Sequence, residues 1–401
     1  MTKEQPEFQS GQASVSLQGQ QPDELILPAQ AEAWRQQALQ LSPLAQLGWF
    51  RLGDWAEQHN LPQQAIYCYR QALEQVLPRD PLHALCHERL GHLLFLGQNH
   101  LEAEQHYLLA LEQDSQLFGA ALNLGCIYFA RRQFRQAEHW VRQAIALRPD
   151  NPAAWENLAE ICRQRQKLAD AGAAYARVWQ RQHRPDLMVR HALLFPMVFA
   201  TEAEIPIWLE RFAAGLAQLT RAGIQLHNPS RQVGVLHANL HYAGPPWTEL
   251  ARQLAVFFRQ ACPGLASQAP HCALSARRPG ERLRLGIVTP NFKQHSLGRM
   301  FGQLVPELDR SRFEVVLCSS EVATDMLGQR LAAAADQYLT LPNAFFAARS
   351  ALARQGFDIL LYPEIGGDPQ SYYLGFARLA PLQLALWGLG SSTGLPQIDA
   401  Y

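Results

Sequence analysis

The sequence predicts two architectures in series, an α-helical solenoid followed by an α/β lobe of the Rossmann-like type. Two observations support this prediction. Residues from about 46 to 185 repeat at a fixed period, and residues from about 281 onward alternate between strand-like and helix-like segments. A period of this length indicates stacked helical hairpins, and strand–helix alternation indicates a parallel sheet covered by helices.

The repeat is anchored on small residues that each follow a leucine, at Gly53, Gly91, Gly125 and Ala159. The later spacings are 34 residues (125 − 91 and 159 − 125), and the first is 38 because of a four-residue insertion. Alanine stands twelve residues after each anchor. These small residues let the two helices of a hairpin approach closely. Sixteen residues after each anchor stands a larger side chain that is expected to fill the gap between repeats. These residues are Tyr69, Tyr107, Val141 and Tyr175.

This pattern resembles the tetratricopeptide repeat. The resemblance implies a superhelix whose concave face binds an extended polypeptide. A rigid spacer without a ligand of its own is the alternative that the pattern leaves open.

The sequence divides the chain into four predicted segments. We expect a disordered N-terminus at 1–22, because it is rich in Gln, Ser, Gly and Pro, and a repeat array with a capping helix at 23–185. A helical connector interrupted by Pro and Gly occupies 186–280, and the α/β lobe occupies 281–401.

Composition narrows the class of protein. Hydrophobic residues make up 48% and charged residues 17%, as in a globular protein. Lys+Arg and Asp+Glu balance at 35 each, which argues against a dedicated nucleic-acid binder. The seven cysteines have no CxxC spacing and fit reduced, buried thiols in a cytoplasmic protein. No secretory signal or membrane span is expected.

Within the lobe, five apolar runs read as strands and alternate with helical patterns. The expected strands are 283–289, 313–319, 338–341, 359–363 and 382–387, and the expected helices are 299–308, 326–335, 344–355 and 370–378. Because helices separate the strands, we expect a parallel sheet with both faces covered.

Three polar loops follow strands of this sheet, so we expect them to converge on one crevice. His295, in the first loop, can hold or accept a proton near neutral pH, or can cap the following helix. In the second loop, Asp368 precedes Pro369 and fits a helix N-cap, whereas Glu364 has no evident structural role and is the better candidate to contact a substrate hydroxyl. Lys293 and Arg299 could attract an anion, although charged side chains on loops and at helix starts are usually solvated.

The third loop, 388–394, reads GLGSSTG and could cradle a phosphate or sugar through backbone N–H groups and hydroxyls. Its spacing is not a dinucleotide fingerprint, and the chain has no P-loop motif. No His, Cys and Asp cluster shows metal-ligand spacing.

Together these features resemble a known family. The array, the connector, LRLGIVTPNFKQHS at 283–296 and RLAPLQLALWGLGSSTGLPQIDAY at 378–401 are similar to the O-GlcNAc transferase (SPINDLY-type) glycosyltransferases, in their bacterial branch. The resemblance covers about 46–401. One departure is Gly390, which stands where the family usually has proline.

The resemblance implies a glycosyltransferase of the B type, metal-independent and inverting, with 281–401 as the first of two lobes. A nucleotide-diphosphate sugar such as UDP-GlcNAc would be the co-substrate, and no cofactor is expected. The acceptor would be Ser or Thr of a protein held by the array. His295 matches the catalytic histidine. The substrate-binding positions would be Glu364, Asp368, Gly390, Ser391, Ser392 and Thr393.

The resemblance also places the end of the first lobe near Tyr401. A second lobe with the nucleotide pocket is therefore expected to be missing from this sequence, and the chain to be inactive alone. Two alternatives remain open, a non-catalytic scaffold that binds protein through its array and the remnant of a disrupted gene.

Overall fold

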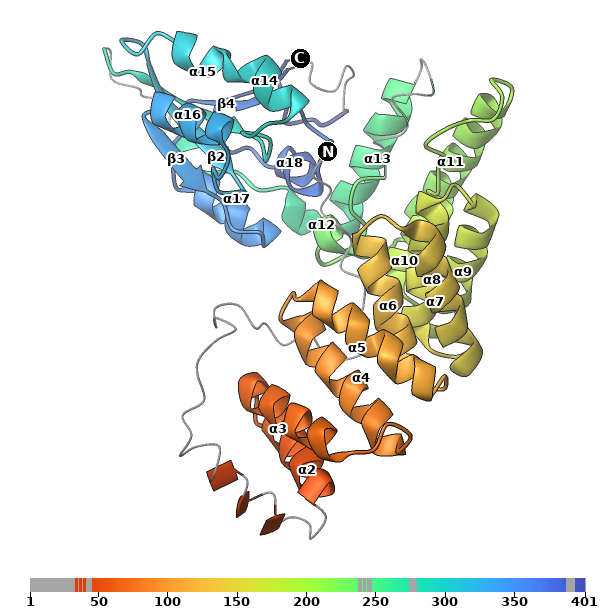
Figure 1. Cartoon of the computed structure of the whole chain (residues 1–401). Coiled ribbons are helices and arrows are strands. Elements are labelled where there is room, and N and C mark those ends of the chain that lie inside the picture. Colours follow the sequence, from red (N-terminus) through yellow and green to blue (C-terminus); the bar gives the residue numbers. More distant parts are fainter. Residues whose placement is uncertain are drawn as a thin grey trace. The chain divides into compact units, whose positions relative to one another are not determined.

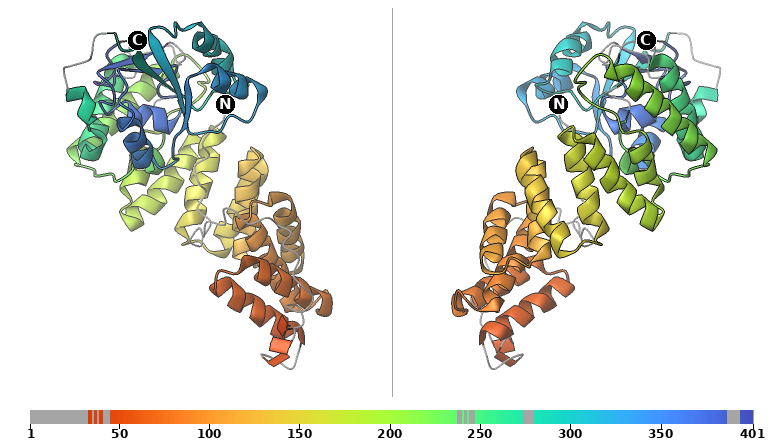
Figure 2. Two further views of the ribbon diagram at one scale, coloured as in Figure 1. Left: turned by 90° about the vertical axis from the view of Figure 1, so that its left-hand side faces the viewer. Right: turned by 90° about the vertical axis from the view of Figure 1, so that its right-hand side faces the viewer.

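The computed structural model describes residues 33–34, 36–37, 39–40, 45–236, 240, 243, 247–273, 280–386 and 394–400. The chain divides into two compact units, with the boundary between Val178 and Trp179. Figures 1 and 2 show the helical unit from red to yellow-green and the α/β unit from green to blue. Each unit has a hydrophobic core of its own. The expectations for 1–22 and for most of the capping helix lie outside the described residues.

The first unit is a stack of helical hairpins, as the repeat predicts. Each anchor lies in the first helix of a hairpin, and the large residue sixteen positions later lies in the second. The hairpins are α2 (Ala45–Gln58) with α3 (Pro62–Gln75), α4 (Pro81–Leu96) with α5 (His100–Gln113), α6 (Phe118–Ala130) with α7 (Phe134–Leu147), and α8 (Pro152–Gln164) with α9 (Leu168–Gln182).

Every hairpin turns through a residue in the left-handed region, seven positions after its anchor. Amide-to-carbonyl bonds close the turn; for example, the amide of Gln133 donates to the carbonyl of Tyr128 at 2.8 Å. Such bonds satisfy the last carbonyls of the first helix. The four turn residues, with their φ angles, are Asn60 (59°), Gln98 (64°), Arg132 (62°) and Gln166 (60°).

The anchor glycines are required by close packing inside the hairpin. A Cβ on Gly53 would lie 2.6 Å from the Tyr69 ring, and one on Gly91 would lie 2.8 Å from the Tyr107 ring. Tyr69 also packs with Leu90 and Leu93 of the next hairpin. The large residue therefore fills space within its own hairpin as well as the predicted gap between repeats.

The second unit contains a five-stranded parallel sheet in the order β3-β2-β1-β4-β5. This is the start of the doubly wound order 3-2-1-4-5-6. The strands are β1 (Leu283–Val288), β2 (Phe313–Ser319), β3 (Gln337–Thr340), β4 (Ile359–Tyr362) and β5 (Leu382–Ala385). The helices between them are α14 (Ser296–Gly302), α15 (Leu304–Glu307), α16 (Met326–Ala334), α17 (Phe345–Ala353) and α18 (Pro369–Leu374). The helix expected at 299–308 is thus two short helices.

Side chains alternate between the two faces of the sheet, and each face is covered. Leu285 and Leu317 pack with Phe292 and with residues of α15 and α16. Val316 and Leu360 point to the opposite face, where they share a core with α17 and α18. This alternation is what a sheet buried on both sides requires.

The helices expected in the connector pack into that second core. Phe212, Leu254 and Phe258 belong to the same cluster of buried residues as Val316 and Leu360. The elements are α10 (Pro185–Ala192), α11 (Glu204–Arg221), α12 (Pro229–Gln232), α13 (Trp247–Ala261), and the short 3₁₀ helices η2 (Pro263–Leu265) and η3 (Pro270–Ala273). The boundaries predicted at 186 and 281 stay predictions. Among the helices of the described ranges, none combines the length and hydropathy needed to cross a membrane.

Candidate functional site

The strand order creates one switch point in the sheet. From β1 the chain continues to β2 and β3 on one side, and β4 and β5 lie on the other side of β1. Loops leaving the carboxyl ends of β1 and β4 therefore diverge, and in open α/β sheets ligands bind in the crevice between them. The candidate residues His295, Glu364 and Asp368 all lie on these two loops or at the helix starts that follow them.

Glu364 is the most buried of the three and has structural partners. Its side chain is 1% exposed. Its Oε1 accepts a hydrogen bond from the Thr289 hydroxyl at 2.6 Å and another from Asn291 Nδ2 at 2.7 Å. The view that Glu364 has no structural role is therefore wrong, because its carboxylate joins the loops that follow β1 and β4. Nothing in the sequence near Glu364 shows these partners, which lie 75 and 73 residues away.

The second carboxylate oxygen of Glu364 differs from the first in its hydrogen bonding. Oε2 is buried and makes no hydrogen bond among the described residues. Burial raises the pKa of Glu364 to about 7, although the bonds from Thr289 and Asn291 act in the opposite direction. A buried carboxyl group with one free oxygen and a pKa near neutrality can either donate or accept a proton under ordinary conditions.

Asp368 acts as the N-cap of α18. It has extended backbone angles, its carboxylate accepts from the Ser371 amide at 2.9 Å, and Pro369 occupies the first helical turn. The Ser371 hydroxyl also donates to it. Burial raises the pKa of Asp368 above its usual value, against the effect of these bonds. The capping alternative considered from the sequence is the arrangement present in the structure.

His295 caps α14 in a similar way. Its Nδ1 accepts a hydrogen bond from the Leu297 amide at 3.3 Å. Burial lowers the pKa of His295, and the nearby Lys293 ammonium lowers it further, so the ring is neutral at neutral pH. Because Nδ1 accepts, the neutral ring carries its hydrogen on Nε2. This arrangement suits donation of a hydrogen bond from Nε2 better than removal of a proton by Nε2.

The loop that carries His295 is held on both sides. The Gln294 amide donates to Asp325 at 2.6 Å, and Lys293 forms an ion pair with Glu321. The Arg299 guanidinium donates to the Gln294 side chain. The two cations considered as anion attractors therefore already have partners. These bonds fix the loop on the N-terminal side of His295 to the residues around it.

The remaining predicted residues, Gly390, Ser391, Ser392 and Thr393, lie outside the described residues. The described chain on either side of them is well anchored. The Leu386 amide donates to the Tyr362 carbonyl at 2.8 Å, and Gly394 has φ of 68°. A Cβ on Gly394 would lie 2.5 Å from the backbone nitrogen of Arg252, so only glycine fits there.

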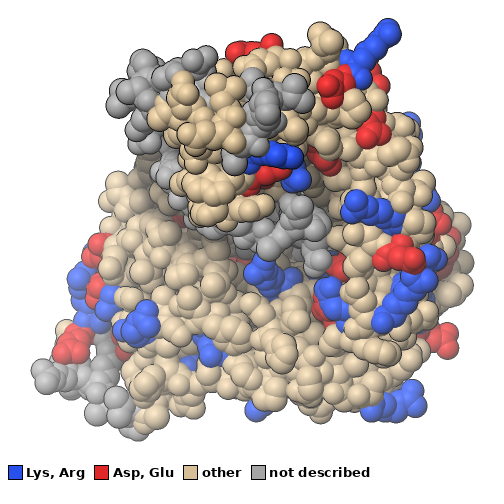
Figure 3. Space-filling model, turned by 90° about the horizontal axis from the view of Figure 1, so that it is seen from below, with Lys and Arg blue, Asp and Glu red and all other residues tan. Residues whose placement is uncertain are grey.

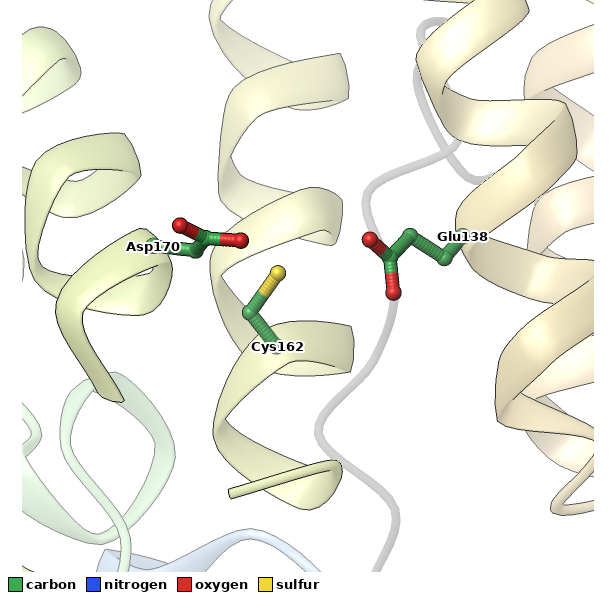
Figure 4. Close-up of side chains that lie close together, drawn as sticks. All are labelled: Glu138, Cys162 and Asp170. Carbon is green, nitrogen blue, oxygen red and sulfur yellow. The ribbon is translucent and has the colours of Figure 1, made fainter. Parts of the chain in front are cut away.

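A group of potential metal ligands lies in the array. Glu138 of α7, Cys162 of α8 and Asp170 of α9 have ligand-type atoms within 4.8 Å of one another (Figure 4). Glu138, however, forms ion pairs with Arg142, Arg165 and Lys167, and Arg142 also pairs with Asp170. Burial raises the pKa of the Cys162 thiol to about 11. We interpret this group as a charge network that joins hairpins.

The surface of the molecule carries both signs of charge. On the face shown in Figure 3, basic and acidic side chains are interspersed. This agrees with the equal numbers of basic and acidic residues in the sequence.

Comparison with known proteins identifies the array. The tetratricopeptide repeat family matches residues 59–117 and 122–186, so the chain contains tetratricopeptide repeats. No curated protein matches the chain.

Three solved structures show weaker likeness. An O-GlcNAc transferase mutant from Thermobaculum terrenum is 17% identical over 79% of this chain and 52% of that one, with a TM-score of 0.47. The Pseudomonas aeruginosa protein pilF is 20% identical over 48% of this chain and 83% of its own, with a TM-score of 0.36. YrrB, a TPR protein with an unusual peptide-binding site, is 16% identical over 48% and 92%, with a TM-score of 0.40. The chain spans about half the length of the transferase.

Proposed function

We propose that the chain is a protein O-glycosyltransferase, with the array holding a polypeptide acceptor and the α/β unit contributing to sugar transfer. The sugar, GlcNAc by family resemblance, would pass from a nucleotide-diphosphate donor to a Ser or Thr hydroxyl. One observation carries this proposal. A capping histidine and a buried, half-satisfied carboxyl group lie on the loops of one switch point, in a chain that also contains tetratricopeptide repeats.

The roles of the two groups follow from their hydrogen bonds. His295, with its hydrogen on Nε2, would donate to an oxygen of the sugar or of the departing diphosphate and hold it in place. Glu364, with Oε2 free, would contact a substrate hydroxyl. In this account His295 is a donor and positioning group, and no metal ion is needed. The loop 388–394 would contribute hydroxyls to the sugar.

The test is transfer of labelled GlcNAc from UDP-GlcNAc to Ser- and Thr-containing peptides by the full chain, assayed alone and together with a separately expressed second lobe of a related transferase. His295→Ala, Glu364→Gln and Glu307→Gln are compared under the condition that gives transfer. A positioned hydrogen-bond donor that stabilises developing charge contributes about 10²–10³-fold in rate, so we expect a loss of that order for His295→Ala. Glu364→Gln should lose less, and Glu307→Gln, an exposed carboxyl on α15, should lose nothing. Transfer that survives His295→Ala unchanged would contradict the proposal.

A second function has support of its own. His295 and Asp368 both cap helices, and Glu364 joins two loops, so all three have structural work without any substrate. This favours a non-catalytic scaffold that binds polypeptide through its repeats. Peptide binding by the full chain, measured by fluorescence anisotropy, separates the two functions. A scaffold binds peptide and transfers no sugar to it under any donor concentration tested.

A further inference from the structure

The solvent-facing side of the second hairpin carries three exposed leucines. Leu101, Leu108 and Leu109 all lie on α5 (Figure 1) and are 65%, 39% and 42% exposed. Leu101 and Leu108 are seven residues apart, which is about two turns, so they lie on one stripe of the helix. Single exposed apolar side chains are common on protein surfaces, but a group of three on one helix indicates a surface that another molecule covers.

The other hairpins show that the repeat does not require leucine at these positions. The three leucines stand 10, 17 and 18 residues after the anchor Gly91 (101, 108 and 109 against 91). At the same distances from the other anchors stand only glutamine, arginine and alanine. These residues are Gln63, Arg70 and Gln71 in the first hairpin, Arg135, Arg142 and Gln143 in the third, and Ala169, Ala176 and Arg177 in the fourth. The leucines of α5 therefore serve something other than packing within the array.

A pocket of about 290 Å³ lies beside this stripe, between α5 and α7. Sites for free small molecules usually measure about 300–1,000 Å³, so this pocket suits a single side chain better. Because an α-helix rises about 1.5 Å per residue, Leu101 lies roughly 15 Å from the middle of the pocket along α5. The same surface thus presents a protruding leucine and a pocket that can receive one. The lining residues are Leu108, Leu111, Glu112, Ser115, Trp140 and Gln143.

Unpaired charges of opposite sign lie at the two ends of this surface. Glu112 is exposed in the last turn of α5, and Arg135 is exposed in the first turn of α7. Neither forms an ion pair with any residue that the structure describes. As the second helices of successive repeats, α5 and α7 run in the same direction. The surface is therefore acidic at its carboxyl end and basic at its amino end.

We propose that this surface binds a second copy of the chain through a two-fold contact, with the two α5 helices antiparallel. In such a contact both copies use the same surface, so a protruding group and the pocket that receives it must both be present on it. Leu101 of one copy enters the pocket of the other, and the axis passes near Gln105, which is exposed and uncharged. The antiparallel direction places acidic ends opposite basic ends, whereas a parallel one would oppose like charges. This contact is independent of the proposed sugar transfer.

The experiment measures the mass of the full chain by sedimentation equilibrium over a range of concentrations. We expect a reversible equilibrium between monomer and dimer. Leu101→Gln and Leu108→Arg introduce the residues of the first hairpin, so the fold should stay intact, as circular dichroism checks. Each leucine is lost twice per dimer, so either variant should weaken association at least about 100-fold. The control Ile207→Gln replaces a side chain that is 66% exposed on α11, in the other unit, and should leave association unchanged.

An exchange of charges tests the antiparallel arrangement. Glu112→Arg places a cation in the last turn of α5, and Arg135→Glu places an anion in the first turn of α7, so both substitutions suit the helix dipoles. Each variant alone opposes like charges twice per dimer and should associate about 10-fold more weakly than the parent chain. An equimolar mixture of the two variants should regain the parent's association, because opposite charges then meet at both contacts.

Three results would overturn the proposal. One is a parent chain that stays monomeric at about 0.1 mM, which would leave this surface to a different protein. Another is association that is unchanged in both leucine variants or that continues beyond the dimer. The third is a mixture of the two charge variants that associates no more tightly than either variant alone.

Discussion

Ionisation of the buried Glu364 side chain lowers the stability of the folded protein. Its pKa is raised from 4.5 to about 7, because burial outweighs the bonds from Thr289 and Asn291. The folded state therefore binds a proton more tightly than the unfolded state does. The contribution of Glu364 to stability is fully present below pH 4.5, and it is lost as the pH rises through about 7.

Glu364→Gln should remove this pH dependence. Glutamine keeps an acceptor for Thr289 and Asn291 and places an uncharged amide where Oε2 is buried. A shift from 4.5 to about 7 corresponds to about 3 kcal/mol. Relative to the variant, the α/β unit of the parent protein should lose up to that amount in free energy of unfolding between pH 5 and pH 8. Urea unfolding at the two pH values measures it, with Glu307→Gln as the control. Parallel curves for parent and variant would count against a raised pKa.

At the scale of the elements, the Glu138 carboxylate joins two helical hairpins, and its pKa is lowered, whereas that of Glu364 is raised. Burial alone would raise the pKa of Glu138, but hydrogen bonds from Lys167, Arg142 and Arg165 lower it. The unfolded state here binds the proton more tightly, so the stabilisation is present above pH 4.5 and is lost as the pH falls. The network connects the third hairpin to the fourth, because Glu138 lies on α7 and Lys167 precedes α9.

The turns between paired helices allow a further test at the same scale. Arg132 holds a left-handed conformation, φ 62°, that strains any side chain with a Cβ. Arg132→Gly should therefore raise the free energy of unfolding of the array by about 0.5–1 kcal/mol. Gln143→Gly, in the middle of the neighbouring helix α7, should lower it by a similar amount. The comparison uses urea unfolding followed by circular dichroism. If both glycines destabilise equally, strain in the turn is negligible.

At the scale of the whole molecule, the sequence predicts the features that depend on local periodicity, which are the helical hairpins and the parallel sheet. The repeat anchors gave the four hairpins, and the alternation of strands and helices gave the parallel sheet. It could not predict the partners of Glu364 or the meeting of His87 with His106, because these contacts join residues on different elements. Thr289 and Asn291 were detectable only as polar residues at the end of an apolar strand.

The two units should unfold as separable transitions. Each has its own hydrophobic core, and the pKa of Glu138 in the array is lowered whereas the pKa of Glu364 in the α/β unit is raised. Glu138→Gln removes a charged acceptor of hydrogen bonds, which costs about 1–3 kcal/mol, and should lower only the transition of the array at pH 7. Glu364→Gln should change only the transition of the α/β unit, and more at pH 8 than at pH 5. Differential scanning calorimetry of the full chain, with residues 45–178 alone to assign the array, measures both effects.

A single transition that moves with either substitution would contradict this prediction and would mean that the two cores fold as one cooperative unit. Helix α9 could couple them, because it runs from Leu168 to Gln182 and so crosses the boundary at Val178.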